Sequence, residues 1–301
     1  MNLPHDFQKR VRDAHGAAGD AWLRRLPELL DEAAGRWSLR LLPPFEPLSY
    51  NYVAPAICAD GREAVLKACV PHRLPLNEIA ALRHYDGRGA VRLLASGAEA
   101  GLMLLERLRP GTPLLLVADD EAATAAAAEV MRQLWRPPPS LPHDLPSVAD
   151  WGRGFHRLRA RFQGGTGPLP PRPVERAEYL YAELSASAGP VVLLHGDLHH
   201  WNILAAERAP WLALDPQGVV GEPTYETGAL LRNPFPEILS IPSARRILAR
   251  RADQLAELLG FDRERVRGWA FAQAVLSAWW EIEVHGGNAA QWVAVAELLE
   301  F

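Results

Sequence analysis

The chain has 301 residues, a formal net charge of −4, and 49% hydrophobic against 23% charged residues. This composition is ordinary for a globular protein, and the length suffices for one large domain or two modest lobes. The slightly acidic balance excludes a general nucleic-acid-binding protein. No stretch reaches the ~18 uninterrupted apolar residues of a membrane span, so we expect neither a nucleic acid nor a membrane as a partner.

Cysteine and lysine are both scarce in the chain. Cys58 and Cys69 are its two cysteines, too few for a disulfide framework, and the first 20 residues lack the apolar core of a secretory signal. We therefore expect a cytoplasmic protein with reduced thiols, as a monomer or weak dimer. The basic residues are 30 Arg and two Lys, Lys9 and Lys67. Neither lysine has the Gly-Lys-Ser/Thr context of a P-loop.

The first third of the chain is predicted to be mostly antiparallel strand. Asp60-Gly61 is a hairpin signal between two extended runs, and a 3.6-residue apolar period predicts helices before and after them. The predicted strands are 37–42, 48–58, 64–70, 91–95 and 101–108. The predicted helices are 19–34 and 76–85.

The rest of the chain is predicted to be mostly helical. Pro-rich stretches at 137–146 and 163–173 separate the helices, and two short apolar runs at 191–194 and 211–214 are strand-like. The predicted helices are 119–134, 147–162, 174–186, 243–259, 263–280 and 289–299. Trp269, Trp279 and Trp280 follow the helical spacing and are expected in the core. The change of period near 107–111 predicts an α+β arrangement of two lobes, 1–108 and 109–301.

Chemically informative residues concentrate between His195 and Asp215. Asp197 and Asn202 lie five apart between the two apolar runs, and Asp215 follows the second run. Two strands flanking a turn bring these three residues to one edge. An amide and a carboxylate oxygen beside a second carboxylate suit Mg²⁺ with a nucleotide, and Asp197 is then placed to accept a proton from an attacking hydroxyl.

Lys67 lies in the middle of a predicted strand, where a cation needs a charge partner or a phosphate. A lysine is a compact point charge suited to phosphate, and Glu78 on the following helix is a candidate partner. The alternatives are a surface lysine on an edge strand and a solvated helix glutamate. The arginine-rich background weakens the first of these.

Together these residues resemble the aminoglycoside phosphotransferases, which share the protein-kinase fold. The phrase L-A-L-D-P-Q-G-V-V-G-E-P-T-Y-E-T-G-A-L-L-R-N-P at 212–234 is similar to the branch of streptomycin 6-phosphotransferases and aminoglycoside/hydroxyurea resistance kinases. Further similar segments are F-E-P-L-S-Y-N-Y-V-A-P at 45–55, L-L-E-R-L-R-P-G-T-P-L at 104–114 and A-Q-A-V-L-S-A-W-W at 272–280. The resemblance implies a protein-kinase-like fold with a small β-rich N-terminal lobe and a larger helical C-terminal lobe.

The resemblance also implies a role for each matching residue. Asp197 would orient or deprotonate the acceptor hydroxyl, and Asn202 and Asp215 would hold Mg²⁺. Lys67, steadied by Glu78, would contact the α- and β-phosphates of ATP. Ser49 would cover the phosphates, and the backbone of the hinge from Glu106 to Leu108 would pair with adenine.

The sequence departs from the general kinase pattern in three places. Asp215-Pro216-Gln217-Gly218 replaces Asp-Phe-Gly, and no G-x-G-x-x-G precedes Lys67. Trp201 is bulkier than expected before Asn202 and would narrow the acceptor site. The run His195-Gly196-Asp197-Leu198-His199 also superficially matches the H-E-x-x-H zinc helix. Gly196 replaces the required Glu, which disfavours zinc, and His195 would instead support the loop through hydrogen bonds.

The acceptor site is expected to use acidic residues of the C-terminal lobe, because carboxylates attract a cationic aminoglycoside. The alternatives for these glutamates are a solvated loop, a helix cap or a helix end, and His199 is either an acceptor contact or a brace of the loop. The candidates are His199, Glu222, Glu226, Glu281 and Glu283.

We therefore expect an ATP- and Mg²⁺-dependent O-phosphotransferase whose acceptor is an aminocyclitol antibiotic such as streptomycin. Three alternatives remain open: a kinase of a metabolic sugar or amino alcohol, a kinase of hydroxyurea, and a pseudokinase that binds nucleotide and regulates a partner. The intact set of Lys67, Asp197, Asn202 and Asp215 disfavours the pseudokinase.

Overall fold

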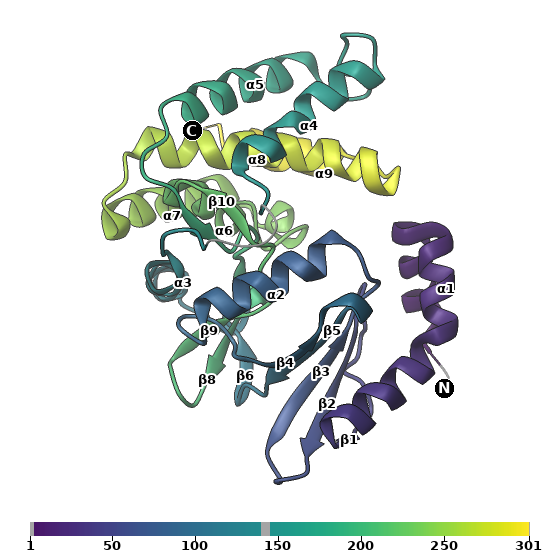
Figure 1. Ribbon diagram of the computed structural model, residues 1–301. Coiled ribbons are helices and arrows are strands. Elements are labelled where there is room, and N and C mark those ends of the chain that lie inside the picture. Colours follow the sequence, from purple (N-terminus) through teal and green to yellow (C-terminus); the bar gives the residue numbers. More distant parts are fainter. Residues whose placement is uncertain (1–2, 140–144, 301) are drawn as a thin grey trace. The chain divides into compact units, whose positions relative to one another are not determined.

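The computed structural model describes residues 3–139 and 145–300, which belong to two compact units (Figure 1). The first unit runs to Gly87 and includes Val91–Gly111, and the second contains Arg88–Ala90 and the chain from Thr112 onward. The centre of the predicted Pro-rich stretch 137–146, residues 140–144, lies outside the described residues.

A five-stranded antiparallel sheet in the order β1-β2-β3-β5-β4 forms the first unit. Each predicted strand is present, with ends that differ by a few residues, and Gly61 (φ 83°) turns the hairpin between β2 and β3. The strands are β1 (Leu39–Leu41), β2 (Tyr52–Cys58), β3 (Glu63–Ala68), β4 (Leu93–Gly97) and β5 (Leu102–Glu106), with the 3-10 turn η1 (Ala98–Ala100) before β5.

Strand β3 is central in this sheet. Side chains on one of its faces belong to the hydrophobic core, and Lys67 on the other face forms a polar contact. Leu66 and Ala68 are fully buried in a cluster with α1 (His5–Trp37). Because successive side chains point to opposite faces, Lys67 faces the other side, where it meets α2 (Arg73–Tyr85). The edge-strand alternative for Lys67 is therefore wrong: the residue pairs with Val53 and Met103 on the two neighbouring strands.

Helix α1 is longer than the predicted 19–34 and changes direction at Gly16 (Figure 1), whose φ of 53° and ψ of −131° are non-helical. Phe7 and Val11 before this kink and Trp22 after it are buried in the same core cluster. Gly16 interrupts the helical period, so the sequence predicts the segment after the kink and misses the segment before it.

The second unit is helical, and α8 lies at its centre: helices α4, α5, α6, α7 and α9 all contact it. Trp269 and Trp279 on α8 are buried, as the sequence predicts, and Trp280 is half-buried. Helix starts follow local chemistry, since Asp119 caps α3 and Ser147 caps α4 in a capping box. The helices are α3 (Asp120–Leu134), α4 (Val148–Arg161), α5 (Pro171–Ala186), α6 (Thr227–Leu231), α7 (Ala244–Leu259), α8 (Arg263–His285) and α9 (Ala290–Leu298).

Short strand pairs in the second unit hold the segment that carries the candidate chemistry. Strand β7 (Val192–Leu194) pairs with β10 (Val219–Gly221), and β8 (Ile203–Ala206) pairs with β9 (Trp211–Ala213). Strands β8 and β10 and helix α6 are too short to produce a period, so the sequence did not predict them. The third strand of the β8–β9 sheet, β6 (Pro110–Pro113), contains the point at which the chain enters the second unit.

Between residues 3 and 300, leaving aside 140–144, no helix has the length and apolar character needed to cross a membrane.

Candidate active site

The loop after β7 folds back on itself through Asp197 and Asn202. The side-chain Nδ2 of Asn202 donates to the backbone carbonyl of Asp197 at 2.9 Å, and its backbone N–H donates to the carbonyl of His199 at 2.9 Å. Since Nδ2 has this acceptor, the amide oxygen of Asn202 is the atom left for a cation. The loop ends in the 3-10 turn η3 (His200–Asn202).

The β8–β9 hairpin returns the chain to this loop. Ile203 is opposite Ala213, and the Leu214 N–H donates to the Asn202 carbonyl at 2.9 Å. Asp215 is therefore the next residue after a direct backbone partner of Asn202. The sequence predicts this approach through the apolar runs 191–194 and 211–214, but these runs lie in different sheets, and the unpredicted strand β8 pairs with β9 instead. Asp215 has a φ of 61°, a left-handed conformation that costs a non-glycine residue about 1–3 kcal/mol and that clusters at functional sites.

His195 ties the two segments together, as the sequence predicts. Its Nε2 donates to the Leu214 carbonyl at 2.8 Å, and its Nδ1 accepts from the Asp197 N–H at 3.3 Å. Its own carbonyl accepts from the Gln217 N–H at 2.7 Å. Burial lowers the pKa of this fully buried histidine to about 4, so the ring is neutral and has one donor and one acceptor nitrogen.

The Asp197 carboxylate has two basic neighbours. Arg232 Nη2 donates to Oδ1 at 3.0 Å, and His199 Nε2 lies 3.5 Å from Oδ2. Burial favours the neutral acid and opposes the effect of these neighbours, but His199 and then Arg232 outweigh it and hold the pKa of Asp197 well below its usual range. The carboxylate is therefore ionised, as a group that accepts a proton must be.

Glu226 lies beneath the loop and corrects one sequence prediction. Its Oε2 accepts from the His195 N–H at 2.6 Å and its Oε1 accepts from the Gly196 N–H at 2.9 Å. The residue is 1% exposed, so it supports the loop before Asp197 and does not face an acceptor. Burial raises the pKa of Glu226 to about 7.

The structure also contradicts the prediction that Glu222 contacts the acceptor. The residue is 5% exposed, and its carboxylate accepts from Arg265 Nε at 2.9 Å and from the Trp269 indole N–H. The predicted alternative of a solvated loop is wrong as well, because the Glu222 carboxylate is buried and paired with Arg265.

The two glutamates at the end of α8 lie in different surroundings. Arg157 holds Glu283 through two bonds, Nε to Oε1 at 2.6 Å and Nη2 to Oε2 at 2.9 Å. The carboxylate of Glu281 lies against Gly287, close enough that a Cβ on that glycine would meet it. The structure thus brings neither glutamate to the Asp197 carboxylate, whose side-chain partners are Arg232 and His199.

In the first unit, the predicted Lys67–Glu78 ion pair is present. Lys67 Nζ lies 2.7 and 2.8 Å from the two carboxylate oxygens of Glu78. Ser49 is exposed before β2, and the Glu106 N–H already donates to the Arg92 carbonyl at 2.9 Å. Leu108 is buried.

Sequence reasoning missed Arg232, which touches Asp197 from 35 residues away. One arginine among 30 carries no local signal. Trp201, the residue singled out for its bulk, is 48% exposed beside Asn202.

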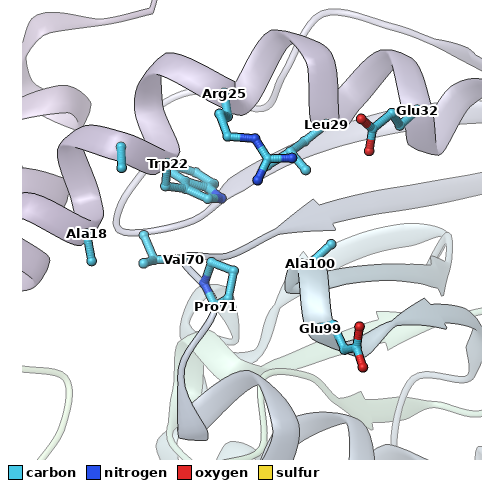
Figure 2. A pocket seen from close by; sticks show the side chains of 10 residues that line it. Ala18, Trp22, Arg25, Leu29, Glu32, Val70, Pro71, Glu99 and Ala100 are labelled. Atoms are coloured by element: carbon cyan, nitrogen blue, oxygen red, sulfur yellow. The ribbon is translucent and has the colours of Figure 1, made fainter.

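A separate pocket of about 430 Å³ lies within the first unit, between α1 and the segments around Pro71 and η1 (Figure 2). Trp22, Arg25 and Glu99 are among its lining residues. None of the predicted site residues lines it, so the sequence did not point to it.

The protein is similar to characterised kinases over most of its length. The family model described as "Aminoglycoside/hydroxyurea antibiotic resistance kinase" matches residues 46–285. A streptomycin 6-kinase of Streptomyces glaucescens is 33% identical, with 96% of this chain and 93% of the relative covered. A hydroxyurea phosphotransferase of Kitasatospora aureofaciens is 36% identical, with 94% of this chain and 82% of the relative covered.

Solved structures with the same fold share little sequence with the chain. A choline/ethanolamine kinase family protein from Mesorhizobium loti has a TM-score of 0.64 at 15% identity, covering 91% of this chain and 95% of that one. A thermostable mutant of aminoglycoside phosphotransferase APH(4)-Ia, in a ternary complex with ADP and hygromycin B, has a TM-score of 0.59 at 14% identity, covering 89% and 97%.

The fold is therefore protein-kinase-like, and the class of protein is a small-molecule phosphotransferase that uses a nucleotide. Within this class, the chain belongs to the aminoglycoside/hydroxyurea antibiotic resistance kinase family.

Proposed function

We propose that the protein is an ATP- and Mg²⁺-dependent O-phosphotransferase that modifies an aminocyclitol antibiotic such as streptomycin. The observation that carries this proposal is the meeting of Asp197, Asn202 and the segment before Asp215 at one end of the β8–β9 hairpin. Since ATP is the donor, we place the reaction in the cytoplasm.

Asp197 is the proposed proton acceptor. Its carboxylate is ionised, and while Arg232 holds Oδ1 at 3.0 Å, Oδ2 has only the longer 3.5 Å contact with His199 among the described residues. A hydroxyl placed at Oδ2 would be oriented for attack on the γ-phosphate and would lose its proton to Asp197 as the new bond forms. His199 is then placed to contact the acceptor hydroxyl.

The donor set at the end of the hairpin fits Mg²⁺. Asn202 offers an amide oxygen and Asp215 a carboxylate, and hard oxygen ligands with phosphate oxygens and water complete the coordination that Mg²⁺ prefers. When bound, the cation would neutralise charge on the phosphates. Lys67, held by Glu78, is the proposed contact to the α- and β-phosphates, with Ser49 covering them and the backbone from Glu106 to Leu108 next to adenine.

Hydroxyurea is the second candidate acceptor, and the structure supplies an observation in its favour. Glu222, Glu226 and Glu283, three of the acidic residues proposed to attract a cation, already have basic or amide partners. A small neutral acceptor needs no such carboxylates. The relative described as a hydroxyurea phosphotransferase is consistent with this candidate.

An acceptor panel tests the proposal. ADP release would be measured with streptomycin, hydroxyurea, a simple sugar and an amino alcohol, and the products would be identified by mass. We expect phosphorylated streptomycin from the wild type and a loss of about 10²–10⁴-fold in kcat from Asp197→Asn. Phosphorylation of hydroxyurea alone would select the second candidate, transfer to the sugar or amino alcohol alone would show a metabolic kinase, and nucleotide binding without turnover would show a pseudokinase.

A further inference from the structure

Arg232 follows α6 and is held between Asp197 and an aromatic pair. Its side chain is 10% exposed, and Nη2 donates to Asp197 Oδ1 at 3.0 Å. Its Cζ lies 5.9 Å from the centre of the Trp292 ring. Trp292 in turn stacks on Phe235 with ring centroids 3.7 Å apart and an interplanar angle of 7°. The guanidinium therefore has little freedom to turn away from the carboxylate.

The hydrogen bonds of Arg232 differ from those of Arg251 and Arg265, two arginines of the same unit that form structural pairs. Arg251 uses Nε and Nη2 on Asp120 and Nη1 on the Asn233 carbonyl. Arg265 likewise uses each of its three nitrogens on protein acceptors. The Nε of Arg232 is buried and has no acceptor among the residues that the structure describes.

A buried donor without an acceptor costs about 1–3 kcal/mol. Arg251 and Arg265, which form structural pairs, both satisfy this donor. The unsatisfied Nε beside a reactive carboxylate therefore indicates that the donor is kept for a group that arrives with the substrate.

The bond to Asp197 also distinguishes its two oxygens. Arg232 holds Oδ1 through one hydrogen bond, and Oδ2, whose contact with His199 is longer, is the oxygen left to receive a proton. This contact joins one guanidinium nitrogen to one carboxylate oxygen, and its charge makes it stronger than a hydrogen bond between neutral groups.

We propose that Arg232 positions Asp197 for phosphoryl transfer and donates its Nε–H to an oxygen of the bound acceptor. The inference rests on the proposed function. In the step itself, the acceptor O–H bond breaks and the proton goes to Asp197 Oδ2. The acceptor oxygen bonds to the γ-phosphorus, and the bond from that phosphorus to the β–γ bridging oxygen breaks to release ADP.

A double-mutant cycle with Asp197 tests this role. Arg232→Gln is expected to lower kcat by about 100-fold in the wild type, because a small misplacement of a catalytic group has this effect. In the Asp197→Asn background the same change should lower kcat by less than about threefold, since a positioning residue has no further effect once its target is lost. The acceptor KM should rise and the ATP KM should not.

Arg232→Lys and Arg265→Gln complete the design. The lysine variant keeps the charge without the fork, so it should recover part of the lost kcat and covers the case in which the glutamine variant fails to fold. Arg265→Gln should lower the melting temperature without changing kcat, because Arg265 pairs with Glu222 away from the loop. Equal losses from Arg232→Gln in both backgrounds, or losses that follow the melting temperature, would overturn the proposal.

Slow ATP hydrolysis, with water as the acceptor, separates this inference from the choice of antibiotic. If no compound of the panel is phosphorylated, the proposed acceptor class is wrong. The Arg232 proposal still requires hydrolysis to fall in Arg232→Gln and to remain unchanged when the substitution is added to Asp197→Asn. Hydrolysis that is equal in wild type and Arg232→Gln would refute it.

Discussion

Lys67 and Glu78 form a buried ion pair in which one ammonium lies 2.7 and 2.8 Å from both oxygens of one carboxylate. Their residues are 3% and 7% exposed. Removing one partner of such a pair leaves a buried charge and costs about 3–5 kcal/mol, whereas replacing both partners by hydrophobic residues of similar volume is often neutral. Lys67→Ala is therefore expected to lower both the melting temperature and the use of ATP.

The paired variant Lys67→Met with Glu78→Met separates these two effects. It should restore most of the melting temperature and leave the ATP KM at least about tenfold above wild type, because the phosphate contact is still missing. Steady-state kinetics and thermal unfolding of the single and double variants are the measurements. ATP kinetics that recover together with stability would assign the pair to the fold alone.

Glu226 gives a second prediction, in which stability and activity change oppositely with pH. Its pKa is raised to about 7 in the folded state, above the usual carboxyl value. Between pH 4.5 and 7 the folded state binds more protons at this group than the unfolded state does. The free energy of unfolding contributed by Glu226 therefore falls as pH rises through this range, by up to about 3 kcal/mol.

Activity should rise over the same range. Only the ionised carboxylate offers both oxygens to the N–H groups of His195 and Gly196. Glu226→Gln keeps one acceptor and places an NH₂ group against the other N–H, so we expect a loss of kcat with a flatter pH dependence of stability. Urea unfolding and kcat from about pH 5 to 8, compared between the wild type and this variant, test both trends. Parallel curves for the two proteins would show that Glu226 does not titrate there.

The candidate site was predictable where its contacts are local. Asp197 and Asn202 lie in one short loop, and Leu214, the residue before Asp215, is a backbone partner of Asn202. Their closeness in the sequence predicts that these segments meet, although strand β8, which brings Asp215 back, was not predicted. Partners far along the chain left no such signal. Glu222 reaches Arg265 across 43 residues, and Glu226 reaches His195 across 31. Acidic residues in a polar segment look solvated until the fold buries them, which explains why both were predicted at the acceptor site.

The fold was predictable for the same physical reason. The strands of the first unit and the long helices of the second carry a period of their own, and the structure contains them. Strand β10 and helix α6 are stabilised by neighbours and not by a local pattern, since β10 pairs with β7 and α6 packs on α8. Such elements are defined by tertiary contacts alone.

Asp215 leads to a third prediction, which concerns the metal. Asparagine tolerates the left-handed backbone of Asp215 and keeps an oxygen, so Asp215→Asn should fold with a melting temperature close to wild type. Its lost charge weakens a hard cation site. We expect half-maximal activity at a Mg²⁺ concentration about tenfold or more higher, and no turnover from Asp215→Ala. Asn202 stays unchanged in both variants, so its neutral oxygen contributes equally to each of them.

The metal assignment would be wrong if Asp215→Asn showed the wild-type dependence on Mg²⁺. Circular dichroism of both variants serves as the control for folding. If Asp215→Asn folds and binds nucleotide but needs more Mg²⁺, the effect comes from the lost charge of Asp215 and not from its left-handed backbone conformation.

The last prediction concerns how acceptor charge is recognised. Glu283 already has a bidentate partner in Arg157, and Glu222 is buried with Arg265. An ion pair presents little net charge to a ligand, so Glu283→Gln should change the streptomycin KM by less than about twofold. Removing Arg157 instead exposes an uncompensated carboxylate. If streptomycin binds near this end of α8, Arg157→Gln should therefore lower its KM at low salt and lose that effect at high salt, because added ions screen exposed charges.

Hydroxyurea, which is neutral, is the matched control acceptor, and its KM should respond to neither variant. Titrations of both acceptors at two salt concentrations make the measurement. A rise of about tenfold in the streptomycin KM on Glu283→Gln would contradict the prediction and return this carboxylate to the acceptor site.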